Sequence, residues 1–219
     1  MAVGLQEHGH HAAAAAIYDL LEHRRPSHGE FYFNQGSAHF LAGNLPQAIL
    51  AYRRAEQRML FSTDLRANLA DASSRVTAPP EAASGWHWPP LGLEAGIAGY
   101  LLYMIGWTLL AHPSRRMWRW LAIGALLSSL LLFAYFGFST WSAGHQPVAV
   151  ISADGVVLRK GNGPSYAPVE VEGRRLLLNR GVEARALAVR SNGWVQIRLA
   201  SDVVGWAPRA QLLLDHEPP

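Results

Sequence analysis

Two long apolar runs decide the architecture of this chain: LGLEAGIAGYLLYMIGWTLLA (91–111) and LAIGALLSSLLLFAYFGF (121–138). The 21 residues of the first run rise about 32 Å as a helix, enough to cross a hydrocarbon core of about 30 Å. Glu94 is the only ionisable residue in this run, and it falls in the first turn, where an interfacial carboxylate reaches water. The sequence therefore predicts transmembrane helices at 91–111 and 121–138.

The connecting segment 112–120 is too short for a domain, so the two predicted spans form a hairpin and both flanking regions lie on one side. Arg115, Arg116 and Arg119 fall in this segment, whereas the 15 residues outside each span contain no Lys or Arg. The positive-inside rule then makes 112–120 a cytoplasmic loop. The expected localisation is a bacterial inner membrane, multi-pass, with both soluble domains extracytoplasmic (periplasmic).

The region before the spans matches itself at a shift of 34 residues, which sets Gly9 on Gly43 and Tyr18 on Tyr52. A period of 34 residues is that of the tetratricopeptide repeat, a helix–turn–helix unit. Residues 1–75 are therefore predicted to form all-α tetratricopeptide-like helical repeats. The first repeat is incomplete and MAVGLQEHGHH shows no signal peptide. We expect either that the true start lies upstream or that the first repeat is degenerate.

Asn34 and Asn68 stand one period apart, in the first helices of successive predicted repeats. First helices line the concave face of such solenoids, where an amide can donate to and accept from a peptide backbone. The two residues are therefore candidate peptide-binding residues. A solvated polar face explains the same pattern equally well.

Residues 76–90 and 139–147 are predicted linkers, and from 148 to 215 the pattern changes to short β-branched runs separated by Gly and Asn. The segments LRKGNGPSY (158–166), LNRGVEARAL (178–187), GWVQIRL (193–199) and VGWAP (204–208) resemble the bacterial SH3-like domain. This resemblance implies a small all-β barrel in which Tyr166, Trp194 and Trp206 lie in or near a groove for peptide or cell-wall glycopeptide. By size alone, the two indoles are expected in the core, with Tyr166 on a loop.

The predicted fold class is a multidomain membrane protein with helical repeats, a two-helix transmembrane hairpin and an SH3-like barrel. That order resembles the BatE-like family of aerotolerance operons. The resemblance implies a scaffold exposed to the periplasm, with von Willebrand factor A-like membrane proteins and a MoxR-type ATPase as partners. The predicted function is a membrane-anchored, non-catalytic adaptor that holds protein partners. The alternative is a cell-wall-associated module whose SH3-like domain binds peptidoglycan.

Composition argues against several other function classes. The chain has no Cys, and its net charge of +3 comes from basic residues interleaved with acids, so no nucleic-acid partner is expected. It carries no GxSxG or HExxH motif and no paired carboxylates beside a His. The sequence therefore predicts no enzymatic activity, no catalytic residues, no cofactor and no metal site.

Overall fold

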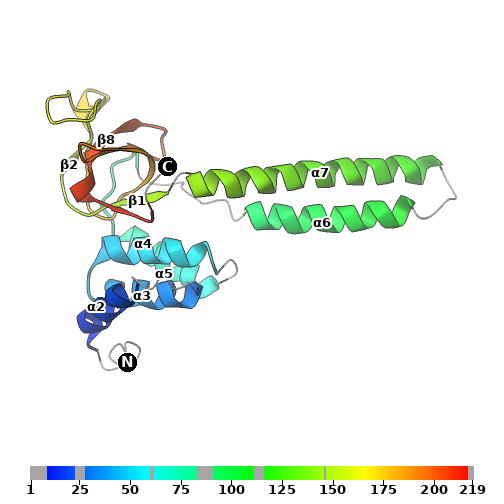
Figure 1. Ribbon diagram of the computed structural model, residues 1–219, viewed down its shortest axis with the longest axis horizontal. Helices are drawn as coiled ribbons and strands as arrows, with labels where there is room; N and C mark the ends of the chain where they lie inside the picture. The colour runs from blue at the N-terminus through cyan, green and yellow to red at the C-terminus, as the bar shows by residue number, and fades with distance from the viewer. Residues whose placement is uncertain are drawn as a thin grey trace. The chain divides into compact units, whose positions relative to one another are not determined.

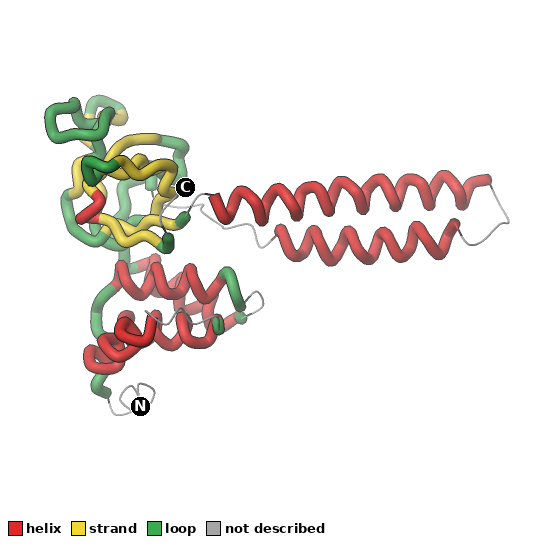
Figure 2. The backbone as a smooth tube through the Cα atoms, in the orientation of Figure 1, coloured by secondary structure: helices red, strands yellow, loops and turns green. Residues whose placement is uncertain are grey.

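The computed structural model describes residues 9–22, 28–59, 62–82, 91–110, 116–145 and 147–216. Within these ranges the chain forms six α-helices, a five-stranded antiparallel sheet and two short two-stranded sheets (Figures 1 and 2). The helices are α2 (His11–Glu22), α3 (Gly29–Leu41), α4 (Leu45–Glu56), α5 (Thr63–Ser74), α6 (Leu91–Leu110) and α7 (Arg116–His145). The strands are β1 (Val148–Ile151), β2 (Val156–Val157), β3 (Glu170–Val171), β4 (Arg174–Arg175), β5 (Leu177–Leu178), β6 (Glu183–Arg190), β7 (Trp194–Arg198), β8 (Val204–Pro208) and β9 (Leu212–Leu214), with a 3-10 turn at Arg209–Gln211.

The chain divides into two compact units. The mixed unit comprises Met1–Gly85 and Gln146–Pro219 and holds α2–α5 together with all the strands. The hairpin unit, Trp86–His145, holds α6 and α7. Residues 83–90 of the predicted linker and 112–115 of the predicted loop lie outside the described residues, and residues 139–145 are helical as the end of α7.

Strand β1 joins the helices to the sheet, because its two faces serve two different cores. The main sheet has the order β8-β7-β6-β1-β9. Side chains alternate between the faces of a strand. Ala149 and Ile151 accordingly pack in the core of the β region, and Val148 and Val150 pack with Ile49 of α4 in the core of the helices. All four β1 residues are buried, as an unbroken VAVI run requires.

The predicted fold class is wrong. We expected separate all-α repeats and an all-β barrel, but α2–α5 and the sheet share buried residues and form one mixed α and β unit. The prediction used the hydrophobic period within each segment. Such a period does not show that both faces of β1 are covered. Successive helices from α2 to α5 pack against one another, but they do not form a separate tetratricopeptide domain.

The predicted two-span hairpin is also wrong. Among the described residues, one helical stretch is long and apolar enough to cross a membrane, Arg119–Phe138 of α7. In α6, the apolar stretch among the described residues is the shorter Ala95–Leu110, which does not reach that length.

Candidate functional site: an aromatic face of the sheet

Strands β7 and β8 place two tryptophans on the same face of the main sheet. In the ladder, Trp194 lies opposite Pro208 and Gln196 lies opposite Trp206. Burial alternates along both strands, and Val195, Ile197 and Ala207 point into the core while the residues between them are only partly buried. Trp194 and Trp206 therefore lie on the outer face, and neither belongs to the core in which their size alone had placed them.

The loop 159–168 is attached to the free edge of β8 beside Trp206. The backbone N–H of Arg159 donates to the Trp206 carbonyl at 2.9 Å, and the Trp206 N–H donates to the Arg159 carbonyl at 2.8 Å. The Asn192 side chain donates to the carbonyl of Asn162 at 2.7 Å, which ties the loop to the turn between β6 and β7. These bonds extend the outer face of the sheet by one further segment.

Tyr166 lies on this loop with 52% of its surface exposed. Its carbonyl accepts a hydrogen bond of 2.7 Å from the Arg159 guanidinium. Its ring covers Gly161 so closely that a Cβ there would lie 2.4 Å from the Tyr166 Cδ1 atom. A glycine at position 161 is therefore what lets the ring lie flat on the loop. The structure thus brings the loop that carries Tyr166 to the strand that carries Trp206, and we call Tyr166, Trp194 and Trp206 with loop 159–168 the aromatic face.

Three arginines surround the aromatic face. Arg190 lies opposite Trp194, and its Cζ atom is 6.0 Å from the centre of the Trp206 ring, within the range of a cation–π contact. Arg198 lies opposite Val204, and Arg159 is the bridge partner of Trp206. None of the three forms an ion pair with another residue in the described ranges. Sequence reasoning missed them, although the alternation in WVQIR and VGWAP was the signal that could have placed Arg198 beside Trp194 and Trp206.

Asn34 and Asn68, the other predicted binding residues, lie in α3 and α5 and are both partly buried. The Asn68 side chain makes a hydrogen bond with the fully buried Tyr52 hydroxyl, which also donates to Ser37 at 3.3 Å. Burial raises the pKa of Tyr52, and the bonds with Ser37 and Asn68 only partly offset that rise. The Asn68 amide is therefore engaged inside the helical core rather than presented to a ligand.

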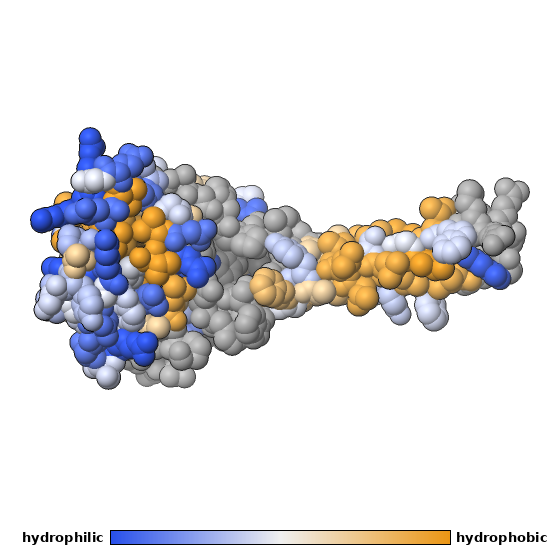
Figure 3. All heavy atoms as spheres, turned by 90° about the horizontal axis from the view of Figure 1, so that it is seen from above, coloured by the Kyte–Doolittle hydropathy of each residue, from blue (hydrophilic) through white to orange (hydrophobic). Residues whose placement is uncertain are grey.

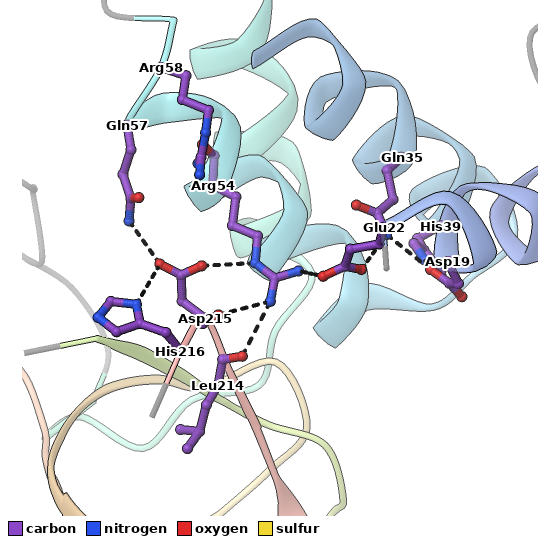
Figure 4. A network of polar contacts seen from close by, with 10 residues as sticks. All are labelled: Asp19, Glu22, Gln35, His39, Arg54, Gln57, Arg58, Leu214, Asp215 and His216. Atoms are coloured by element: carbon purple, nitrogen blue, oxygen red, sulfur yellow. Dashed lines mark hydrogen bonds and ion pairs between the residues drawn. The ribbon is translucent and has the colours of Figure 1, made fainter. Parts of the chain in front are cut away.

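A second polar cluster connects the helices to the end of the sheet (Figure 4). Arg54 of α4 donates to Asp215 at 2.8 Å and also pairs with Glu22, while Gln57 donates to Asp215 at 3.2 Å. Burial acts to raise the pKa of Asp215, but the charge and hydrogen bonds of Arg54 outweigh it and the pKa is lowered. These side chains pair with one another. We interpret the cluster as a clamp that joins α4 to Asp215, the residue after β9.

The same helix makes a second clamp with β6. The Arg53 guanidinium donates to Glu183 at 2.6 and 3.0 Å and to Glu56 at 2.7 Å. Arg185 is buried next to this pair, and burial followed by the charge of Arg53 lowers its pKa to about 10. Sequence reasoning could not find these pairs, because Arg53 and Glu183 are 130 positions apart.

Within the described residues, no group of three or more His, Asp or Glu side chains could hold a metal ion. His39 does pair with Asp19 at 2.9 Å between α3 and α2, but its ring is 4% exposed and is enclosed by helices. The expectation that the chain is not an enzyme stays a prediction.

Comparison with known proteins adds no further constraint. No family model matches the chain, and no curated protein matches it. The resemblance to the BatE-like family therefore stays a prediction, as do the von Willebrand factor A-like and MoxR-type partners that it implies.

Proposed function

We propose that this chain is a non-catalytic adaptor, held at a membrane by its apolar hairpin unit, that binds a partner through the aromatic face of its mixed unit. The observation that carries the proposal is the surface of the hairpin. Its large apolar side chains point outward, including Leu131 at 71%, Leu130 at 66% and Trp107 at 61% exposed. Figure 3 shows apolar side chains along most of the visible surface of the helical hairpin.

Small residues fill the contact between α6 and α7 instead. Ala95, Ala122 and Ser129 are buried there, and a Cβ at Gly99 would come within 3.4 Å of the Ser129 carbonyl. A helix pair in water buries its large side chains and exposes polar ones. The reverse order, with small residues inside and large apolar ones outside, is typical of helices in lipid. An apolar surface of this extent in water would favour aggregation.

Connectivity constrains how the hairpin meets the membrane. The residues that precede and follow it, Gly85 and Gln146, both belong to the mixed unit. Both ends of the hairpin unit are therefore joined to the mixed unit. The periplasmic placement of the mixed unit stays a prediction, which rests on the arginine bias of 112–120.

Alkaline carbonate extraction of membranes from cells that express the full chain tests the anchor. The wild type is expected in the membrane pellet. Replacing Leu130 and Leu131 together with Lys should move the protein to the supernatant, because each lysine costs about 3 kcal/mol in the middle of a bilayer. The same pair of changes at Leu20 and Leu21, exposed on α2, is the matched control and should leave the protein in the pellet. A wild type that is already extracted would refute the anchor.

Binding of cell-wall glycopeptide is the second candidate function. One observation favours it, the exposed ring of Tyr166 on the loop beside Trp206, since sugar rings stack on exposed aromatic groups. The test is co-sedimentation of the full chain in detergent micelles with purified cell wall. Retention that is lost in Tyr166→Ala and kept in Leu177→Ala, another side chain about half exposed, would support this function.

A further inference from the structure

We propose that the aromatic face binds an extended acidic segment of a partner protein, with its carboxylates on Arg159, Arg190 and Arg198 and its apolar side chains on the two indoles. This inference rests on the proposed adaptor function and deepens it by naming the chemistry of the partner. It concerns only the outer face of β7, β8 and loop 159–168.

The charge of the face is the first argument. Several arginines elsewhere in the mixed unit are paired with acids, as in Arg53 with Glu183, Arg54 with Asp215 and Arg180 with Asp154. The three arginines of the aromatic face make no such pair with any described residue. A guanidinium is matched in shape to a carboxylate and can bind it through two parallel hydrogen bonds. The face therefore offers three guanidinium groups that no acid among the described residues pairs with.

The acidic residues nearest in the chain do not cancel this charge. Asp202 lies in the turn between β7 and β8, beyond Arg198 and Val204. Glu170 follows the loop and lies opposite Arg175 in the β3–β4 ladder. Both mark the rim of the face, and neither forms an ion pair with its arginines among the residues that the structure describes.

The apolar floor is the second argument. Trp194 lies opposite Pro208, and Trp206 is the diagonal neighbour of Trp194 in the same ladder, at roughly 7 Å by the geometry of paired strands. Val204, 39% exposed, continues the outer row of β8. Indole surface on a fixed strand binds apolar side chains at low entropic cost, since the strand is already ordered. A partner segment that fits should therefore carry proline or aromatic residues between its acids.

The spacing of the arginines sets the length of that segment. Across the sheet, the segment of Arg159 lies next to β8, β8 lies next to β7, and β7 lies next to β6, which carries Arg190. Three steps of about 4.8 Å, with an offset of two residues along the strand, place the Cα atoms of the two arginines roughly 16 Å apart. An extended peptide advances about 3.3 Å per residue, so two carboxylates four to five residues apart span this distance. Nucleic acid fits less well, because three arginines give no basic stripe along a repeating phosphate backbone.

The experiment measures fluorescence anisotropy of a labelled peptide with the full chain in detergent micelles. The probe peptide carries two Glu residues four positions apart, with Pro and Trp between them. Two control peptides of otherwise identical sequence carry Gln or Lys in place of both Glu residues. The Glu peptide is expected to bind about tenfold more tightly than the Gln peptide, the Lys peptide least, and added salt should weaken the binding. Equal binding of the Glu and Gln peptides would overturn the proposal.

Variants locate the binding site. Arg190→Gln should weaken binding of the Glu peptide about fivefold, and Arg190→Lys should lose less of the affinity than Arg190→Gln does. The matched control is Arg174→Gln, an exposed arginine on the β3–β4 hairpin, which should leave binding unchanged. An equal loss in Arg174→Gln would overturn the assignment, as would tighter binding of a single-stranded oligonucleotide or of cell-wall fragments. Carbonate extraction reports on the anchor separately, so a failure here with intact membrane retention refutes the acidic partner and not the anchor.

Discussion

Gly36 of α3 illustrates how a single position sets the packing of two helices. A Cβ at this position would lie 2.6 Å from the Cδ1 atom of Tyr52, whose side chain is fully buried in α4. The ring cannot move away, because its hydroxyl is held by Ser37. Gly36→Ala should therefore lower the free energy of unfolding by about 1–3 kcal/mol, the cost of overpacking a core. Urea denaturation of the full chain in micelles, followed by circular dichroism, measures it.

Gly43 is the control for this change, because its backbone conformation, and not a close neighbour, favours glycine there. Its φ is +81°, in the turn between α3 and α4, and no atom lies within 4 Å of the position of its Cβ. Asn tolerates this left-handed conformation, so Gly43→Asn should be nearly neutral, whereas Gly36→Asn should be worse than Gly36→Ala. Equal effects of Asn at the two positions would contradict the steric account of Gly36.

At the scale of elements, the clamp between α4 and the end of β9 holds helix and sheet together. The side chains of Arg54 and Asp215 are 12% and 11% exposed. Removing one partner of a buried pair leaves an uncompensated charge, so Asp215→Asn should cost about 3 kcal/mol. The matched control is Asp71→Asn, which breaks the pair of Asp71 with Arg75, exposed at 50% and 56%, and should cost less than about 1 kcal/mol. Thermal melting of both variants decides whether burial makes this difference.

The same clamp gives the mixed unit an acid-sensitive contribution. The folded pKa of Asp215 is lower than its unfolded value of about 4. Its contribution to stability is therefore complete above about pH 4 and is lost as the pH falls through the folded pKa. Stability measured from pH 6 downward should decline in the wild type, and the decline should be smaller in Asp215→Asn. Parallel declines in the two proteins would show that other carboxylates account for the acid sensitivity.

At the scale of the whole molecule, the two parts of the mixed unit are expected to fold together. Val148 and Val150 of β1 are buried among the helices, so residues 146–219 alone would expose that face, as residues 1–85 alone would expose Ile49. Replacing the hairpin, residues 86–145, by a flexible Gly/Ser linker should leave one cooperative melting transition. Each half by itself should melt far lower or remain unfolded. Two separate transitions in the linked protein would restore the independent domains that the sequence suggested.

The sequence by itself determined the local features of this chain. Gly43 and the run Ser191-Asn192-Gly193 are residue types typical of turns, and both glycines have φ near +80°. Helical and strand regions followed from periodicity, and the exposed position of Tyr166 followed from its place in a loop. All of these features depend on residues that are close in the chain, so the amino-acid sequence is sufficient to predict them.

The tertiary structure alone decided which faces meet. Both faces of β1 are covered, and Arg53 and Arg54 reach Glu183 and Asp215, through contacts between segments that lie far apart in the chain. For the candidate site, residue type suggested Tyr166 and the two tryptophans but not the arginines around them. Their convergence is a product of strand register, and register is set by packing across the sheet between segments distant in the chain.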